Sequence, residues 1–349
     1  MKKCVIYGSY GYSGNLIAEV ASTSGKPVLL SGRNEKKLAE QASRLGLNYQ
    51  KASLESDGEM DALLRDASVV IHCAGPFTYT WKPMAKACLR NRCNYLDITG
   101  EIDVFESLKR LGSKFEEKQL MAMPGVGFDV VPTDCVASML KKELPDANRL
   151  ELAFWSFRSG VSQGTAKTII ENLGKGGLIR ESGKLKRVPA AFKNKTIHFG
   201  DRSSKAVSIP WGDISTAYTS TEIENIVVYM AAPKRLIRLM KLSNYIKPIL
   251  RANWLKTYLT RKVEQKPAGP SREELKKGKA LIWGRAENRK GESREIAIQT
   301  ADGYRLTSET AWLIAVKVMN ENFRPGYQTP SLVYGPELIF ESRMTEKVS

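Results

Sequence analysis

Residues 3–18 read KCVIYGSYGYSGNLIA, a short apolar strand that leads into three glycines and then into an amphipathic helix. Gly8 suits a tight turn out of the strand, and Gly11 leaves the backbone bare enough to approach a pyrophosphate. Gly14 opens a helix whose free N–H groups and partial positive charge would face the phosphates. The stretch therefore predicts a dinucleotide cradle, with cofactor-binding residues Gly8, Ser9, Tyr10, Gly11, Tyr12, Ser13 and Gly14.

The glycine spacing is G-x-x-G-x-x-G rather than the commoner G-x-G-x-x-G, so the flanking strand and helix carry the interpretation. A second strand, 27–31, follows and leads into Ser31, Gly32 and Arg33. An acidic residue at this place would bind a free ribose 2′-hydroxyl, whereas Ser31 and Arg33 offer a donor and a positive charge to a 2′-phosphate. The sequence thus favours NADP(H) over NAD(H). The alternative is that Arg33 only begins a solvated helix over 35–45.

Strand and helix patterns alternate through the first 125 residues, which predicts an α/β, Rossmann-type doubly wound parallel sheet. The predicted strands lie near 3–8, 27–31, 48–51, 68–73, 94–98 and 119–123. From about residue 150 the pattern becomes polar-apolar alternation, which predicts a second α+β domain on a largely antiparallel sheet. Its predicted strands are 150–155, 196–199, 205–209, 224–229, 279–284 and 294–300, with helices at 165–173 and 308–320 and an exposed connection at 264–279.

These patterns predict two domains in the chain of 349 residues. Residues 1–130 form the nucleotide-binding Rossmann domain, completed by the C-terminal segment 305–349. Residues 131–304 form a domain that covers the substrate. The chain lacks a signal-peptide pattern and an apolar run of about 18 residues, so we expect a cytoplasmic protein. The five cysteines form no C-x-x-C pair and read as reduced core thiols.

The formal net charge of +17 is concentrated in the second part of the chain. Residues 1–130 carry 17 Lys and Arg against 15 Asp and Glu, which leaves 37 against 22 for the rest. Nine basic residues and no acidic one lie within 234–262, among many apolar residues. This predicts a pair of basic amphipathic helices divided near Pro248.

Three interpretations of residues 234–262 stay open: a solvated helix pair, a peripheral contact with an anionic membrane, or a docking surface for an acidic carrier protein. Nucleic acid is not expected as a partner, because no recognition module accompanies the charge. The sequence leaves a homo-oligomer open.

Several segments together resemble the saccharopine-dehydrogenase-like family, most closely its trans-acting enoyl reductase branch. They are residues 7–14, 74–77, 95–101, 124–134, 164–166, 325–330 and 335–338. The resemblance implies an NADPH-dependent oxidoreductase that reduces an activated carbon-carbon double bond on an acyl or prenyl-like lipid. The family also contains enzymes of carbon-nitrogen bonds in amino acids, whose substrates want convergent arginines; Arg158, Arg180 and Arg202 are candidates. A non-catalytic, lipid-associated nucleotide-binding protein is the third alternative.

The candidate site residues follow the fourth and fifth predicted strands, whose carboxyl ends lie beside the cofactor in a doubly wound fold. Ala74, Gly75 and Pro76 are expected near the nicotinamide ribose. The predicted catalytic residues are Tyr79, as proton donor to an enolate, with Asp97 and Glu101.

Each of these residues also has a structural interpretation. The residue pair Asp97 and Thr99 can cap the helix over 102–111, with Glu101 near its positive end. His72 reads as a buried histidine and Asp129 as a hydrogen-bonded anchor. No metal site is expected, since the two histidines, His72 and His198, lie far apart without nearby ligand spacing.

Overall fold

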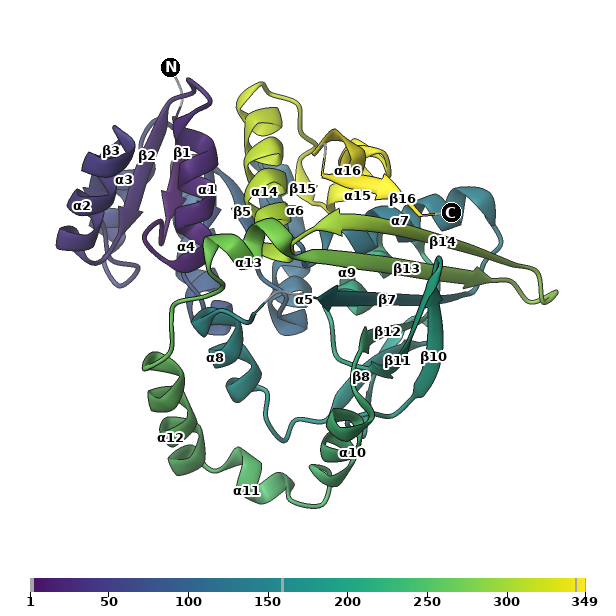
Figure 1. Cartoon of the computed structure of the whole chain (residues 1–349). Coiled ribbons are helices and arrows are strands. Elements are labelled where there is room, and N and C mark those ends of the chain that lie inside the picture. Colours follow the sequence, from purple (N-terminus) through teal and green to yellow (C-terminus); the bar gives the residue numbers. More distant parts are fainter. Residues whose placement is uncertain (1–2, 158–159, 343, 349) are drawn as a thin grey trace. The chain divides into compact units, whose positions relative to one another are not determined.

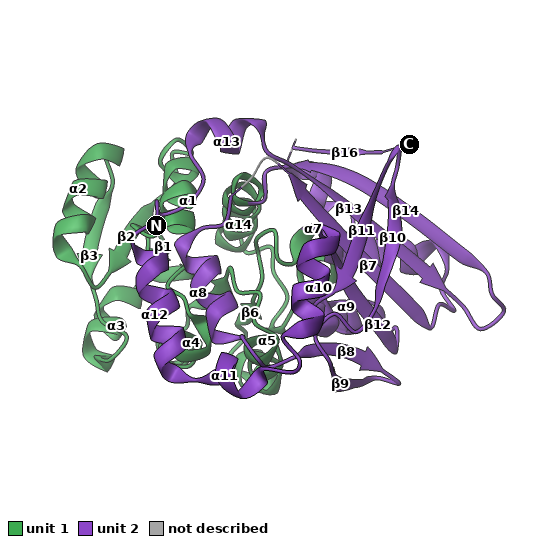
Figure 2. Ribbon diagram, turned by 60° about the horizontal axis from the view of Figure 1, so that its bottom comes forward, with its two compact units in different colours: residues 1–131, 304–333 green, residues 132–303, 334–349 purple. Residues whose placement is uncertain are grey.

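The computed structural model describes residues 3–157, 160–342 and 344–348, and the chain divides into two compact units (Figures 1 and 2). Unit 1 comprises residues 1–131 and 304–333, and unit 2 comprises residues 132–303 and 334–349.

Unit 1 is built on a parallel sheet with the strand order β15-β6-β5-β4-β1-β2-β3. The bounds are β1 (Lys3–Tyr7), β2 (Val28–Gly32), β3 (Asn48–Lys51), β4 (Ala67–His72), β5 (Asn94–Asp97), β6 (Met121–Met123) and β15 (Gly326–Tyr327). All of its pairings are parallel, which confirms the predicted doubly wound sheet. The short edge strand β15 was not predicted, since two residues show no periodicity.

Helices cover this sheet because its central strands are apolar on both faces. Every residue of β4 is buried, and Cys4, Val5 and Ile6 of β1 are fully buried. The helices are α1 (Tyr12–Ser22), α2 (Glu35–Leu45), α3 (Asp57–Leu64), α4 (Phe77–Asn91), α5 (Ile102–Arg110) and α6 (Gly112–Glu117). The predicted helices over 35–45 and 102–111 are thereby confirmed.

The long helix α14 (Gly303–Met319) brings the chain back to unit 1. Its Thr310 hydroxyl donates to the Val126 carbonyl at 2.8 Å, and its Thr307 hydroxyl accepts from the Phe128 N–H at 2.9 Å. The loop after β6 is therefore fixed by a segment that lies about 180 residues later in the sequence.

The final residues depart from the predicted division. Residues 334–349 belong to unit 2 and not to unit 1. The physical reason is that β16 (Thr345–Lys347) pairs antiparallel with β14 (Ser293–Ala301), with Thr345 opposite Thr300.

Unit 2 contains a mixed sheet with the main order β10-β11-β12-β7-β13-β14-β16. Its other strands are β7 (Arg149–Phe157), β8 (Gly177–Glu181), β9 (Lys184–Val188), β10 (Asn194–Phe199), β11 (Arg202–Ser208), β12 (Asn225–Ala231), β13 (Lys279–Glu287) and β14 (Ser293–Ala301). The pairings are antiparallel except for β12 with β7, so the predicted second, largely antiparallel sheet is confirmed.

Helices of unit 2 include α7 (Val131–Glu143), α8 (Gln163–Glu171), α9 (Asp213–Thr221) and α16 (Leu338–Glu341), and α15 (Pro330–Tyr334) lies at the boundary of the units. The predicted basic helix pair is three helices: α10 (Lys234–Leu242), α11 (Lys247–Arg251) and α12 (Asn253–Glu264). Pro248 does not divide them, because it lies in the first turn of α11, where its missing N–H is no loss.

The expected exposed connection at 264–279 contains a helix, α13 (Arg272–Lys277). Ser271 and Glu274 form a capping box at its start, and Leu275 is buried. The Ser-x-x-Glu spacing was a signal for this helix in the sequence. Among the described residues, no helix has the length and apolar character needed to cross a bilayer.

Candidate functional site

The three N-terminal glycines pack against one another at the carboxyl end of β1. Gly8 has φ +78°, a conformation that glycine adopts readily. The Gly11 N–H donates to the Gly8 carbonyl at 3.0 Å. A Cβ added at Gly14 would lie 2.4 Å from that same carbonyl oxygen, and one at Gly11 would lie 3.2 Å from it. Gly14 therefore allows the turn to close on helix α1, and Gly11 keeps its outer surface bare.

The N-terminus of α1 is suited to an anion. Gly11 is the N-cap and has no side chain to satisfy the first N–H groups, and no acidic residue lies in the first turn. Backbone N–H groups at a helix N-terminus, together with the helix dipole, favour a phosphate. The cradle that a Cβ would fill thus fits the pyrophosphate of a dinucleotide.

Ser9 contributes to this cradle differently from the prediction. Its side chain is fully buried and donates to the Gln41 amide oxygen at 2.7 Å, while the Gln41 amide donates back to the Ser9 carbonyl at 2.8 Å. The Ser9 hydroxyl is therefore used to hold α2 against the turn. Sequence reasoning missed Gln41, because a glutamine in an amphipathic helix is expected on the solvent face.

Of the remaining cradle residues, Tyr12 packs edge-on against Tyr304 of α14, with ring centroids 5.1 Å apart. Ser13 is half-buried in the first turn of α1.

The residues predicted for the adenosine end lie at the carboxyl end of β2, with Ser31 and Gly32 inside the strand and Arg33 directly after it. The Tyr10 ring lies against Gly32, where a Cβ would come within 2.6 Å of the ring, and its hydroxyl accepts from the Asn34 N–H at 3.2 Å. Arg33 is exposed. The Ser31 side chain is fully buried. Binding of a 2′-phosphate by Arg33 and Ser31 stays a prediction, and of the two side chains only that of Arg33 is exposed.

The end of β4 lies beside the cradle, as expected at the switch point between β1 and β4. The Cys73 N–H donates to the Tyr7 carbonyl at 2.8 Å, and a Cβ on Gly8 would lie 2.9 Å from the Ala74 nitrogen. Gly75 is exposed and Pro76 is the N-cap of α4. The structure thus brings Ala74, Gly75 and Pro76 next to the glycine turn.

Glu101 holds the start of α4. One carboxylate oxygen accepts from the Phe77 N–H at 2.8 Å, and the other accepts from the Thr78 N–H at 2.9 Å and from the Thr78 hydroxyl. The carboxylate therefore caps α4. Glu101 is also the N-cap residue of α5, near its positive end as the capping alternative supposed, but its side chain makes no capping hydrogen bond to α5. These contacts let Glu101 position the 74–78 turn, and its predicted catalytic role stays a prediction.

Asp97 is a buried anchor at the end of β5, and its predicted catalytic role stays a prediction. Its carboxylate accepts from the Tyr95 hydroxyl at 2.6 Å and from the N–H groups of Thr99 and Gly125 at 3.0 Å each. Burial raises the pKa of Asp97 to about 6, although these hydrogen bonds oppose the rise. The contacts tie the end of β5 to the loop after β6.

His72 agrees with its interpretation as a buried histidine. Its Nε2 lies 3.0 Å from the Thr80 hydroxyl, which donates to the Ala74 carbonyl at 2.7 Å. The hydroxyl has one proton, so this arrangement assigns the ring proton to Nε2. Burial lowers the pKa of His72 to about 3, so the ring is neutral near pH 7.

Tyr79 lies in the first turn of α4 and is 66% exposed. Of the three predicted catalytic residues, it is therefore the one whose acidic proton faces solvent, and its catalytic role stays a prediction.

Comparison with known protein families shows what most of unit 1 is similar to. Residues 4–123 match the family model described as the saccharopine dehydrogenase NADP binding domain. Over these residues unit 1 is similar to the NADP-binding domain of saccharopine dehydrogenase, and NADP(H) is its cofactor. The residues that would hold it are those of the glycine turn.

Particular relatives match parts of the chain. A saccharopine dehydrogenase-like oxidoreductase of Rattus norvegicus is 25% identical over 213 residues, which cover 53% of this chain and 50% of the relative. A trans-acting enoyl reductase of Mycobacterium leprae is 32% identical over 142 residues, 37% of this chain and 33% of the relative. A lipid droplet localized protein of Caenorhabditis elegans is 26% identical over 278 residues, 70% of this chain and 63% of the relative.

The chain spans about half the length of the first of these relatives. Among solved structures, apo saccharopine dehydrogenase (L-Glu forming) from Saccharomyces cerevisiae matches with a TM-score of 0.66 at 11% identity, and the match covers 100% of both chains. At that identity the likeness concerns the fold.

Proposed function

We propose that this protein is an NADPH-dependent reductase of an activated carbon-carbon double bond, on an acyl or prenyl-like lipid. The observation that carries the proposal is the cradle of Gly8, Gly11 and Gly14 beside the 74–76 turn, in a domain that matches an NADP-binding family. When bound, NADPH would supply a hydride.

In this proposal, some residues of unit 1 bind the cofactor and others position the residues around it. The N-terminus of α1 binds the pyrophosphate, and Arg33 binds the 2′-phosphate. Glu101 fixes the start of α4, where Tyr79 presents its phenol to solvent. A phenol can both hydrogen-bond a carbonyl and give up a proton, so Tyr79 is the proposed donor to the carbon next to the carbonyl group.

Two relatives support a lipid-like substrate. One is a trans-acting enoyl reductase and another is a lipid droplet localized protein, and each name fits an apolar chain better than an amino acid. These are partial matches, so the substrate class is proposed here for experiment to decide.

A carbon-nitrogen reaction of the saccharopine type is the second candidate, favoured by the likeness of the fold. Its substrate would need arginines to bind carboxylates. The Arg180 guanidinium instead donates to the backbone carbonyls of Ile214 and Gly183, at 2.7 Å each, and Arg202 lies over the Phe157 ring. Arg158 lies outside the described residues. These contacts commit Arg180 to the fold of unit 2 and favour the enoyl reaction.

The test is a titration of the purified protein with NADPH and NADH, followed by NADPH oxidation with enoyl thioesters, prenyl lipids and keto-acid plus amine pairs. We expect selective NADPH binding and turnover of an enoyl or prenyl substrate. Turnover of only the keto-acid pairs would replace the proposal with the second candidate. The proposed activity would be overturned if the protein bound neither nucleotide, or if none of these substrates led to NADPH oxidation.

Two variants assign that activity to the site. Gly11→Val should abolish nucleotide binding while the protein stays folded, because its side chain would occupy the phosphate face of a residue with ordinary φ of −67°. Tyr79→Phe should lower turnover about 10-fold or more with unchanged NADPH affinity. An unchanged rate would remove Tyr79 from the mechanism.

A further inference from the structure

Helices α10, α11 and α12 form what we call the basic helical surface, residues 234–264 of unit 2 (Figure 1, green). Large apolar side chains on it face solvent. Exposed fractions reach 59% for Leu242, 85% for Tyr245 and 68% for Trp254. The others exposed are Leu236, Leu239, Ile246, Ile249 and Tyr258. Isolated exposed apolar residues are ordinary, but a succession of eight along three helices indicates a contact surface.

These helices are attached to unit 2 in an unusual way. Surface helices of globular proteins generally bury their apolar stripe. Here every residue from 234 to 264 is described, yet none in α11 or α12 is buried, and in α10 only Ile237 is.

Polar contacts hold the same helices in place. The Lys256 ammonium donates to the Glu171 carbonyl at 2.9 Å, and the Arg251 guanidinium donates to the Gly174 carbonyl at 3.0 Å. The Asn244 amide oxygen accepts from the Ala190 N–H at 2.8 Å. These three polar side chains thus bond to the rest of unit 2, while the large apolar side chains of the same helices face outward.

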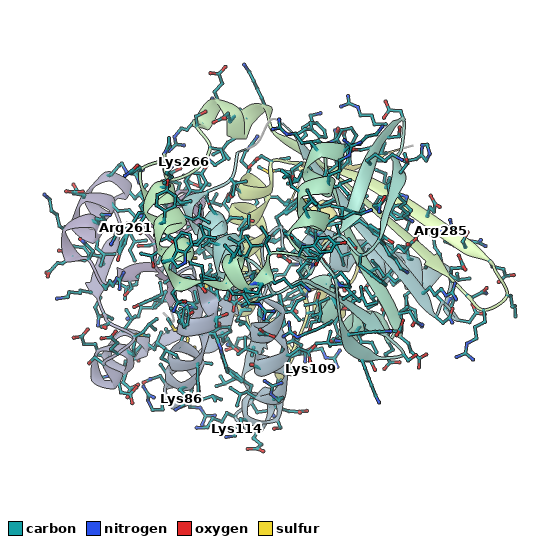
Figure 3. The ribbon with its side chains drawn as sticks, turned by 90° about the horizontal axis from the view of Figure 1, so that it is seen from below. Lys86, Lys109, Lys114, Arg261, Lys266 and Arg285 are labelled. Atoms are coloured by element: carbon teal, nitrogen blue, oxygen red, sulfur yellow. The ribbon has the colours of Figure 1, made fainter. Side chains whose placement is uncertain are left out.

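The charge of this surface is of one sign. Nine Lys and Arg and no Asp or Glu lie within 234–262. Lys234, Arg235, Arg238 and Lys241 of α10 are all exposed. Figure 3 labels two more cations of this region, Arg261 in α12 and Lys266 just beyond it.

We propose that the basic helical surface binds the surface of an anionic phospholipid membrane. Leucine, isoleucine and tryptophan side chains would enter the interface while the cations meet the head groups. Trp254, Tyr245 and Tyr258 are the residue types that favour the boundary between hydrocarbon and water. The inference rests on this surface alone and does not require the proposed reaction.

A membrane fits the surface better than an acidic protein does. Docking by charge steering needs cations but leaves exposed leucines and isoleucines without a function. The apolar groups here follow one another over three short helices and the turn between α10 and α11. A fluid interface accepts such side chains individually.

The experiment is flotation of the full chain with vesicles of pure phosphatidylcholine and with vesicles of 70% phosphatidylcholine and 30% phosphatidylserine. We expect the protein to float with the anionic vesicles, and salt at 0.5 M to weaken the binding because it screens the charges. In parallel, a purified acyl carrier protein is immobilised and tested for capture of the chain.

Two variants separate the contribution of the charges to membrane binding from that of the apolar side chains. Arg235→Glu, Arg238→Glu and Lys241→Glu together should lower partition to anionic vesicles about 100-fold, since each basic residue adds about one factor of five. The matched control reverses Arg289, Lys290 and Arg294, near the turn between β13 and β14, which changes the net charge equally. Leu239→Ser with Trp254→Ser should lower partition at least 10-fold, against Leu185→Ser with Phe192→Ser as control.

Thermal unfolding of each variant shows whether it is folded, independently of any nucleotide. Flotation that is lost in both helical variants and kept in both controls supports the proposal. The proposal is overturned if wild type stays unbound at both lipid compositions or binds neutral vesicles as well as anionic ones. It is also overturned if both control variants lose vesicle binding as much as the helical variants do. Capture by the carrier protein without vesicle binding would assign the surface to that partner instead.

Discussion

The glycine turn of unit 1 and the basic helical surface of unit 2 treat their side chains in opposite ways. Around the turn, the polar side chains of Ser9, Gln41 and Glu101 are bonded to neighbouring residues, and bare backbone is left facing outward. On the helical surface, polar groups such as Asn244 face the protein, and large apolar side chains are left facing outward.

The two regions therefore differ in the groups that each leaves available to bind a ligand. In the turn, the capacity to bind lies in the N-terminus of α1, whose backbone N–H groups and dipole suit a phosphate of fixed geometry. On the helices, it lies in apolar area and diffuse charge, which suit a surface without fixed geometry. Substitution at Gly14, where the turn is most tightly packed, should therefore affect folding, whereas substitution of the exposed side chains on the helices should affect association.

The largest effect is expected at the tightest point of the turn. Gly14→Ala places a Cβ 2.4 Å from the Gly8 carbonyl oxygen, so the backbone must shift. We expect a loss of about 3 kcal/mol in the free energy of unfolding, measured by urea denaturation. Gly58→Ala is the control: nothing lies within 4 Å of its Cβ, so it should stabilise α3 by about 0.5–1 kcal/mol. Equal effects would mean that the turn is not tightly packed.

The second effect concerns the cofactor and leaves the fold alone. Arg33→Asp should raise the Kd of NADPH about 30-fold and that of NADH less than about 3-fold, because an exposed cation is replaced by an anion next to a 2′-phosphate. Fluorescence titration measures both constants. Lys36→Asp makes the same change of charge on the neighbouring helix, and if it weakened NADPH binding equally, Arg33 would have no specific contact.

The third effect is a dependence of stability on pH at the buried base of the site. His72 has a folded pKa of about 3, below its ordinary value of 6.5, so the unfolded chain takes up the proton first. Wild type should lose stability as pH falls from 6.5 towards 3, by about 2 kcal/mol between pH 6.5 and pH 5 relative to His72→Gln. Urea denaturation at both pH values measures this difference.

Asp97 provides a control of opposite sign. Its folded pKa of about 6 lies above the ordinary value of 3.8, so its protonation stabilises the fold as pH falls through 6. Asp97→Asn should therefore lose more stability on acidification than wild type does. If His72→Gln followed the wild-type profile, the histidine would not be buried in its neutral form.

The sequence predicted the framework of unit 1 because its signals are local. Apolar runs and glycines located β1 to β6 within about two residues, and Asn34 caps α2 where the predicted helix begins. The partner of a polar side chain is not local. The hydrogen bonds of Gln41 with Ser9 and of Glu101 with Phe77 form only when the sheet is assembled. No spacing in the sequence therefore predicts either contact.

In unit 2 the sequence predicted where the basic apolar helices lie better than how they are divided and which of their residues are exposed. It located the basic apolar stretch but divided it at Pro248, because a proline interrupts a helix unless it falls in the first turn. It also could not tell which apolar residues are exposed. Periodicity identifies an apolar face, while tertiary packing decides whether that face is buried, and here Ile237 is covered and Leu239 is not.

The smallest effect on folding is expected on that same helix, and it completes the contrast with the turn. Leu239, 56% exposed, already meets water, so Leu239→Ser should change the free energy of unfolding by less than about 0.5 kcal/mol. Ile237, two residues earlier and 7% exposed, is the matched control, and Ile237→Ser should cost about 3 kcal/mol. Urea denaturation without lipid compares them. If Leu239→Ser destabilised the protein as much as Ile237→Ser, part of the chain itself would cover the leucine, and the outward face would belong to the fold rather than to a membrane.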